Sequence, residues 1–236
     1  MNTVQLRAAG VIGVAAAICF VIAFLVDPTP PTAGADPAAV VAHIKAFTVN
    51  DRIAGFLFAG SGALLVAFAA GLREVLFAHA TRAGWLATAM LAGAIHAGTM
   101  LTIISVIFFT LGAAATSFDQ QSAGVLSNIA NYGFIFAGFG TLVFIAFGTA
   151  LMLSARGALR VLGEIGLIAS AAMLVYLSTA FFTTGPFTAG GVVSITCFSI
   201  ASLWVTLTAL ALLTLEPHAL IGPDAPIRAR RARIRS

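Results

Sequence analysis

The sequence predicts an all-α, polytopic membrane protein, and three observations support this prediction. Of the 236 residues, 60% are hydrophobic and only 8% are charged, and the mean hydropathy is +1.06. Soluble domains carry about 25% charged residues, so these charges are too few to cover a water-exposed surface. Six apolar stretches have about the 20 residues that a helix needs to cross a bilayer. Lysine and arginine are concentrated in alternate connecting segments, as in multi-pass proteins.

The first predicted span covers residues 8–26. Ala33-Gly34-Ala35 resembles a signal-peptidase site, so this span could belong to a cleaved signal peptide. Its apolar run is longer than the roughly 7–15 residues of a signal peptide, which favours an uncleaved anchor. The other spans are predicted at 53–72, 84–111, 128–153, 161–182 and 191–213. Helices are expected because lipid offers the backbone no hydrogen-bonding partner, and barrel strands would be shorter and alternating.

The segment 27–52 between the first two spans is the largest predicted exterior feature. Its proline-rich beginning cannot be helical, but Asp36-Pro37 is typical of an N-cap followed by a first helical residue. The spacing predicts a short helix over 37–48, either on the outer membrane surface or capping the bundle. The residues Val40, Val41, Ile44 and Phe47 share its apolar face, and His43 and Lys45 are expected to lie off it. A lid or spacer is the favoured interpretation, and ligand binding is the alternative.

The distribution of basic residues predicts that both termini are cytoplasmic. In this orientation Lys45 and Arg52 are the only basic residues in the outer segments. The preference for arginine over lysine, with abundant alanine and glycine, is typical of GC-rich bacterial genomes. We therefore expect a multi-pass protein of the bacterial inner membrane.

Residues 1–215 are predicted to form the six-span domain, and residues 216–236 a basic cytoplasmic tail. Arginines near an anionic leaflet are each worth about 1 kcal/mol of attraction. We expect the tail to contact anionic lipids, whereas nucleic acid is not an expected partner of so short a segment. The tail arginines are Arg228, Arg230, Arg231, Arg233 and Arg235.

A short internal repeat relates the second and fourth spans. The segment beginning Gly55-Phe-Leu-Phe-Ala-Gly resembles the one beginning Gly133-Phe-Ile-Phe-Ala-Gly, and Asn50 and Asn128 precede them at the same offset. A duplicated helical hairpin, spans 2–3 and 4–5, would explain the match, and chance similarity between apolar helices is the alternative. Small residues let membrane helices approach closely. The predicted packing glycines are Gly55, Gly60, Gly62, Gly133, Gly138 and Gly140.

Few polar residues are expected at membrane depth. His96 is the one ionisable residue near mid-membrane, and such residues are functional candidates, although a hydrogen bond to the next helix is an equally physical role. Thr99 lies near the same helical face as His96. In the fifth span, Glu164 follows Arg160 by one helical turn, so it is expected either to pair with Arg160 or to serve as a proton or cation site. A polar seam between the third and fourth spans is therefore the candidate site. Its fourth-span members are Asn128, Asn131 and Tyr132.

The sequence contains no catalytic motif. It has no Ser/His/Asp set, no HExxH and no phosphate-binding glycine loop, and no Cys/His spacing resembles a zinc site. Cys19 and Cys197 lie in apolar runs and are expected to be buried hydrophobes. A bis-histidine haem would need a second intramembrane histidine beside His96. We therefore expect no catalytic residue, no metal site and no cofactor.

Three features resemble uncharacterised six-span membrane proteins of actinobacterial and firmicute genomes. They are Arg7-x-x-Gly10 at the start of the first span, the proline-rich exterior loop with its short helix, and Asn50-Asp-Arg-Ile-Ala-Gly55. The resemblance implies the six-span architecture and adds no activity or site residue.

Three functions remain open on this basis. The leading hypothesis is a non-catalytic subunit, scaffold or lipid-interacting module of the cell envelope, with a membrane-protein partner or a second copy of the chain. The second is a small transporter or channel for a small or lipophilic solute that uses the polar seam near His96. The third is a membrane enzyme or redox protein.

Overall fold

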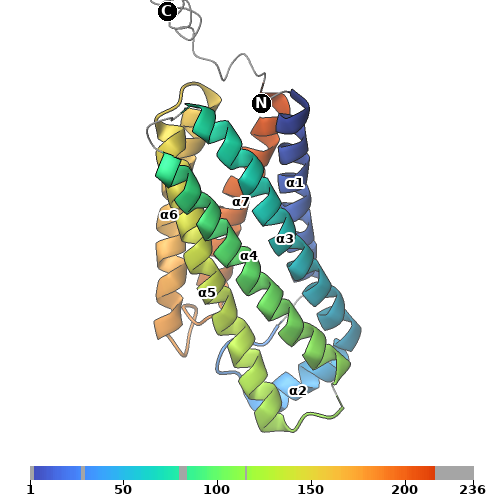
Figure 1. Ribbon diagram of the computed structural model, residues 1–236. Coiled ribbons are helices and arrows are strands. Elements are labelled where there is room, and N and C mark those ends of the chain that lie inside the picture. The colour runs from blue at the N-terminus through green and yellow to red at the C-terminus, as the bar shows by residue number, and fades with distance from the viewer. Residues whose placement is uncertain (1–2, 28–29, 80–83, 115, 216–236) are drawn as a thin grey trace, which may run out of the picture.

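The computed structural model describes residues 3–27, 30–79, 84–114 and 116–215. In these residues every regular element is a helix, as Figure 1 shows. The elements are α1 (Thr3–Val26), α2 (Pro37–Ala46), α3 (Thr48–His79), α4 (Gly84–Ala113), α5 (Gln120–Leu153), α6 (Ala158–Ser178), the 3₁₀ turn η1 (Thr179–Phe181) and α7 (Val192–Thr214). The predicted all-α class is confirmed.

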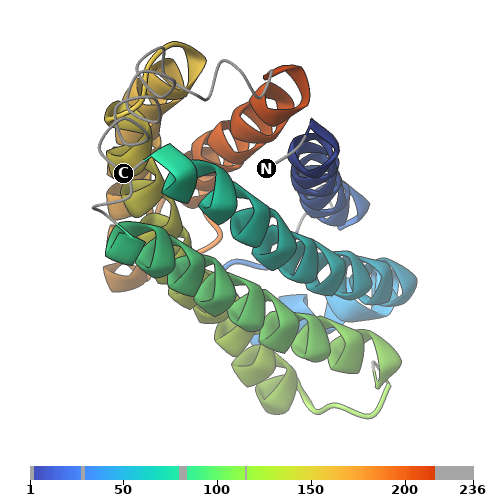
Figure 2. The same cartoon turned by 45° about the horizontal axis from the view of Figure 1, so that its top comes forward.

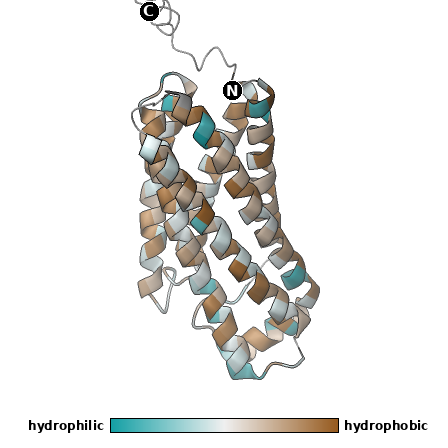
Figure 3. Cartoon of the chain, in the orientation of Figure 1, coloured by the Kyte–Doolittle hydropathy of each residue, from teal (hydrophilic) through white to brown (hydrophobic). Residues whose placement is uncertain are grey.

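Six of these helices are long and apolar enough to cross a membrane. Figure 3 shows hydrophobic residues along all six, with most hydrophilic residues toward the two ends of the bundle. The helices extend beyond the apolar runs because polar residues form their first turns. In α5, Asp119 accepts a hydrogen bond from the Ser122 backbone N–H at 2.7 Å, so the helix begins at Gln120 rather than near 128.

The long helices form a closed ring. Each packs against its neighbour in the chain, and α7 packs against α1 to complete the circuit (Figures 1 and 2). The most buried span is α5: 56% of the residues in its apolar 18-residue stretch are buried, compared with 39% in α3. The residues of α5 face both α4 and α6 and supply much of the core.

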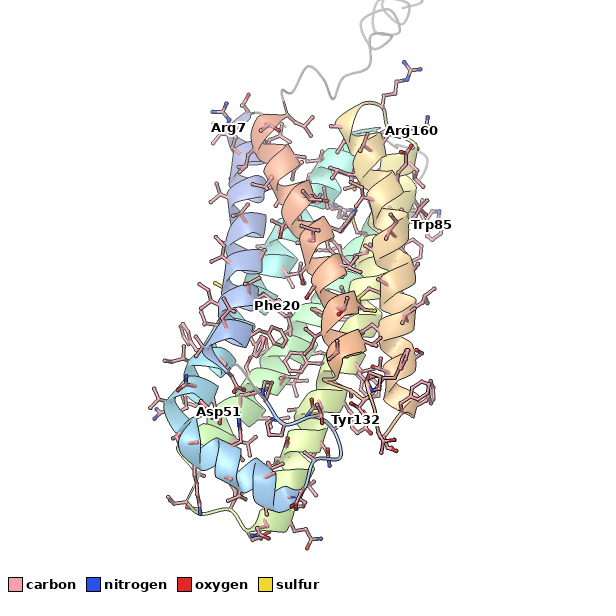
Figure 4. The ribbon with its side chains drawn as sticks, turned by 180° about the vertical axis from the view of Figure 1, so that it is seen from behind. Arg7, Phe20, Asp51, Trp85, Tyr132 and Arg160 are labelled. Carbon is pink, nitrogen blue, oxygen red and sulfur yellow. The ribbon has the colours of Figure 1, made fainter. Side chains whose placement is uncertain are left out.

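The short helix α2 covers one end of the ring, which we call the α2 end. Asp36 caps it by accepting from the Ala38 N–H at 3.1 Å, and proline occupies its first turn. Val40 and Ile44 are buried against α4 and α5. The predicted short helix therefore forms, caps the bundle and ends at Ala46, slightly before the predicted boundary. Figure 4 shows Asp51 and Tyr132 toward this end, and Arg7 and Arg160 at the opposite one.

Three asparagine side chains attach the loop between α1 and α2 to the bundle. Asn50 donates to the Val26 carbonyl at 2.7 Å, and Asn131 donates to the Pro31 carbonyl at 2.9 Å. The Gly34 N–H donates to Asn128 Oδ1 at 2.8 Å. Backbone groups need such partners, so these contacts fix residues 31 to 34 against the α2 end.

Glycines allow α4 to approach both α3 and α5 closely. A Cβ placed on Gly62 would lie 2.8 Å from the Gly98 carbonyl oxygen, and one on Gly140 would lie 2.6 Å from the Gly93 carbonyl oxygen. Gly55 and Gly133 likewise face α4, and Gly138 packs against the ring of Tyr176 on α6. Gly60 is a correction to the predicted packing set, because a Cβ there would meet no atom within 4 Å.

The repeat-matched glycines do not make equivalent contacts. In a duplicated hairpin, Gly62 would contact α4 and Gly140 would contact α6. Gly62 does contact α4, but Gly140 also contacts α4 rather than α6. The matching segments of α3 and α5 therefore pack on the two sides of the same helix, α4.

Candidate functional site

A cavity of about 80 Å³ lies inside the bundle at the α2 end. Most of its wall is apolar, and rings from α1, α3, α4, α5, α6 and α7 pack edge to face or tilted around it. The aromatic side chains of the wall are Phe24, Phe58, Phe108, Phe134, Tyr176 and Phe198. An apolar wall with a few convergent polar groups is typical of small-molecule sites, which usually have about 300–1,000 Å³, so a cavity of this size suits only a small molecule.

The acidic and basic side chains that line this cavity form a cluster of Asp27, His43 and Asp51. Asp27 follows the last residue of α1, His43 lies on α2, and Asp51 lies in the first turn of α3. His43 Nε2 is 2.9 Å from Asp27 Oδ1 and 3.9 Å from Asp51 Oδ1. The side chain of His43 is 10% exposed, that of Asp27 is 4% exposed and that of Asp51 is 3% exposed. Three separate segments thus bring ionisable groups together away from solvent.

Several atoms of the cluster have unmet hydrogen-bonding capacity. Asp27 Oδ1, His43 Nε2 and Asp51 Oδ2 are buried and have no hydrogen-bond partner among the described residues. His43 Nε2 and Asp27 Oδ1 lie at ion-pair distance from each other, whereas Asp51 Oδ2 has no such neighbour among the described residues. Buried polar groups are normally paired, and an unpaired carboxylate oxygen in a protein interior is costly.

The charge of the cluster is unbalanced. Burial lowers the pKa of His43, but the adjacent Asp27 and Asp51 carboxylates raise it further, so that the net pKa lies above the ordinary value. No lysine or arginine is among the residues that line the cavity in the described part of the chain. A protonated His43 therefore offsets one carboxylate at most, and the second carboxylate needs either a proton or another cation.

Sequence reasoning placed His43 off the apolar face of the short helix, and this was wrong. In the structure His43 points toward the bundle, beside the buried residues Val40 and Ile44. Val40, His43, Ile44 and Phe47 follow the i, i+3, i+4, i+7 spacing of one helical face, which is the signal that could have found it. Asp27 and Asp51 stand at the two ends of the segment 27–52 that is predicted to be exterior, and nothing local in the sequence pairs them.

The residues of the predicted seam lie elsewhere. His96 is exposed on the outer surface of α4, where its Nε2 is 3.1 Å from the Phe136 carbonyl oxygen on α5. Thr99 is exposed one turn further on. His96 does not line the cavity at the α2 end or the second cavity described below. The contact matches the structural alternative considered for His96, a hydrogen bond to the next helix.

The other predicted residues divide between the two ends of the bundle. Asn131 lines the cavity, Asn128 holds the loop above it, and Tyr132 is half-buried against the core. Glu164 lies at the opposite end, 3.5 Å from Arg160, and both side chains are largely exposed. An exposed ion pair of this kind contributes little to stability. The tail arginines lie outside the described residues.

A second cavity of about 50 Å³ lies further along the bundle, between α1, α3, α4, α5 and α7. Phe198 lines both cavities, and its ring stacks on Phe20 with centroids 5.0 Å apart. Figure 4 shows Phe20 between Asp51 and the opposite end of the molecule. The polar cluster is thus confined to the cavity at the α2 end.

Fold and site together define a multi-pass integral membrane protein with a cavity that is aromatic along its walls and acidic at one end. Comparisons with known proteins found no matching family model, no matching curated protein and no matching solved structure. The resemblance to six-span bacterial proteins therefore stays a prediction.

Proposed function

We propose that the protein is a non-catalytic, lipid-interacting module of a bacterial cytoplasmic membrane that holds a small, mostly apolar molecule in the cavity at the α2 end. The observation that carries this proposal is the cavity itself, because its walls are aromatic and aliphatic while its polar groups converge at one end. Burial of apolar ligand surface against such walls contributes roughly 25 cal/mol per Å².

The polar end of the cavity supports an amphipathic ligand. The apolar part of the molecule would lie against Phe58 and Phe134, and its polar group would meet Asp27, His43 and Asp51. A fully apolar molecule would leave the cluster unsatisfied, so it fits the cavity less well.

The arginine distribution supports an outward-facing cavity. Arg7 and Arg160 lie at the end opposite Asp51, and the remaining arginine-rich segments of the sequence connect to that end. Segments rich in lysine and arginine stay in the cytoplasm, so the α2 end would face the exterior. A ligand could then reach the cavity from outside the cell or from the outer leaflet.

The test compares a variant that fills the cavity with one that changes the lipid-facing surface. Ala130 lines the cavity and is 3% exposed, whereas Ala150 lies on the exposed face of the same helix, α5. Each is replaced by leucine, and the chains are purified in nanodiscs without added ligand. Mass spectrometry then measures the small molecules that remain bound.

We expect the wild type and Ala150→Leu to retain the same molecule near one per chain, and Ala130→Leu to lose it. Equal retention in both variants would place the molecule outside the cavity. A wild-type chain that carries only bulk lipid in the proportions of the membrane would also contradict the proposal.

The transport hypothesis centred on His96 receives less support from the geometry. A transport route needs a cavity that reaches the proposed residue, and His96 instead lies on the outer surface of α4. Its contact with the Phe136 carbonyl fits a role in joining α4 to α5.

A further inference from the structure

We propose that Asp27, His43 and Asp51 bind a divalent transition-metal ion of the Zn²⁺ type at the polar end of the cavity. One ligand atom from each side chain lies within 4.8 Å of the others. Two ligands at about 2.1 Å from a common ion lie roughly 3–4 Å apart, depending on the angle between them. The distance of 3.9 Å from His43 Nε2 to Asp51 Oδ1 lies in this range, and that of 2.9 Å to Asp27 Oδ1 lies just below its lower end.

The unpaired atoms point independently to a bound cation. Asp27 is 3% exposed and Asp51 is 2% exposed, and each presents a buried oxygen without a hydrogen-bond partner among the described residues. His43 Nε2 has Asp27 Oδ1 at ion-pair distance, 2.9 Å, but meets no hydrogen-bond partner among the described residues. A shared metal ion would satisfy all three atoms at once, which a proton on one of them cannot do.

Charge balance supports an ion of charge +2. In the metal-bound state, two ionised carboxylates and a neutral His43, the form of histidine that binds metals, would together carry a charge of −2. The other residues that line the cavity, within the described chain, supply no lysine or arginine. A divalent ion would neutralise the site and remove the cost of isolated buried charges.

The ligand types narrow the choice of ion. Mg²⁺ and Ca²⁺ prefer all-oxygen sites, whereas an imidazole nitrogen favours zinc and its neighbours in the first transition row. Three protein ligands leave a fourth position of a tetrahedral ion open, as in zinc sites that bind a further molecule. Here that position would face the cavity.

This inference does not depend on the amphipathic ligand proposed above, because the three side chains form the metal site whether or not that ligand is bound. The experiment therefore uses Zn²⁺ alone. Loss of the apolar molecule in Ala130→Leu and the presence of a Zn²⁺ site are separate results, and either proposal can fail while the other stands.

The binding test uses the full chain, purified in mild detergent, stripped with a chelator and titrated with Zn²⁺ in a calorimeter. The test variants are Asp27→Asn, His43→Gln and Asp51→Asn, which keep side-chain size while removing a ligand. Asp119→Asn is the matched acidic control, since it lies at the same end and asparagine also caps helices. His96→Gln is the matched histidine control.

We expect one high-affinity Zn²⁺ per wild-type chain and per control chain. Each test variant should bind more than about 100-fold more weakly, beyond the 10–100-fold effect of changes around a metal site. Absence of a stoichiometric site in the wild type would overturn the proposal. Equal loss in the controls, or unchanged affinity in all three test variants, would also overturn it.

A second measurement needs no variant and so does not depend on the folding of the substituted chains. X-ray absorption of the Zn²⁺-loaded wild type counts imidazole and carboxylate ligands directly. One imidazole with oxygen ligands supports the site. A spectrum with sulfur, with two or more imidazoles, or with none would assign the ion to other residues and exclude this cluster.

Discussion

Trp204 shows how a single polar atom is accommodated in this apolar core. It is fully buried on α7, and its ring packs edge to face against the Phe144 ring, with the ring centroids 5.8 Å apart. Its Nε1–H donates to the Leu162 carbonyl oxygen of α6 at 2.9 Å. The side chain thus combines a large apolar contact with a satisfied donor, whereas Asp27 and Asp51 are equally buried but retain unpaired oxygens. This contrast distinguishes a structural polar group from a candidate site.

Replacement of Trp204 by phenylalanine should lower the free energy of unfolding by about 1–3 kcal/mol, because it removes the hydrogen bond to Leu162 and part of the ring volume. Trp85 is 66% exposed and provides the matched control. Trp85→Phe should change the stability by less than about 0.5 kcal/mol. Denaturation in mixed detergent micelles measures both, and equal losses in the two variants would contradict this account.

At the scale of elements, α4 packs between α3 and α5 so closely that its glycines contact backbone atoms of both neighbours. A Cβ on Gly93 would lie 2.5 Å from the Phe144 backbone nitrogen, and Gly98 meets the Gly62 carbonyl oxygen in the same way. Lipid provides no hydrophobic drive for helix association, so such close packing is a main source of stability within the membrane. The glycine pattern of the sequence indicated this packing, but not that α4 would be the shared partner.

Gly93→Ala should force α4 and α5 apart and destabilise the fold by about 1–3 kcal/mol, because the added methyl group meets backbone atoms that cannot rotate away. Gly60→Ala is the control, since its methyl group would meet no atom within 4 Å. This variant should be neutral or more stable by up to about 1 kcal/mol, the difference in helix propensity. Thermal unfolding in detergent checks both, and a stable Gly93→Ala chain would refute the close approach.

At the scale of the whole molecule, the ring of six helices places its two chemically different ends on opposite sides of a membrane. The α2 end carries the acidic cluster and Lys45, while Arg7 and Arg160 lie at the other end. An even number of spans also puts Thr3 and Thr214 at the same end. Arg7 and Arg160 are therefore separated from the site by the length of the bundle, whereas Arg52 follows Asp51 in α3.

Cysteine labelling should show the α2 end outside the cell, because lysine- and arginine-rich segments are retained in the cytoplasm. In a chain whose Cys19 and Cys197 are replaced by alanine, Ser117→Cys and Ser154→Cys each introduce one exposed thiol at opposite ends. An impermeant maleimide added to intact cells should label Ser117→Cys, and Ser154→Cys only after lysis. The reverse pattern would invert the proposed orientation.

The sequence by itself determined the six spans and the capped helix α2. Each of these depends on a local property, either the apolar length of one segment or the Asp36-Pro37 signal, and a segment needs no partner to possess it. Hydropathy also excluded a soluble fold. The sequence also shows Asp27, His43 and Asp51 within one predicted exterior segment, but it does not show that they meet.

Only the tertiary structure decided which polar residues meet. Asp27, His43 and Asp51 come from three segments, and their convergence depends on how α1, α2 and α3 close the end of the ring. The same packing turned His96 outward, because the small residues Gly93, Ala97 and Gly98 took the inner faces of α4. Hydropathy is fixed within one helix, whereas a site is fixed by the angles between helices, and no local pattern encodes those angles.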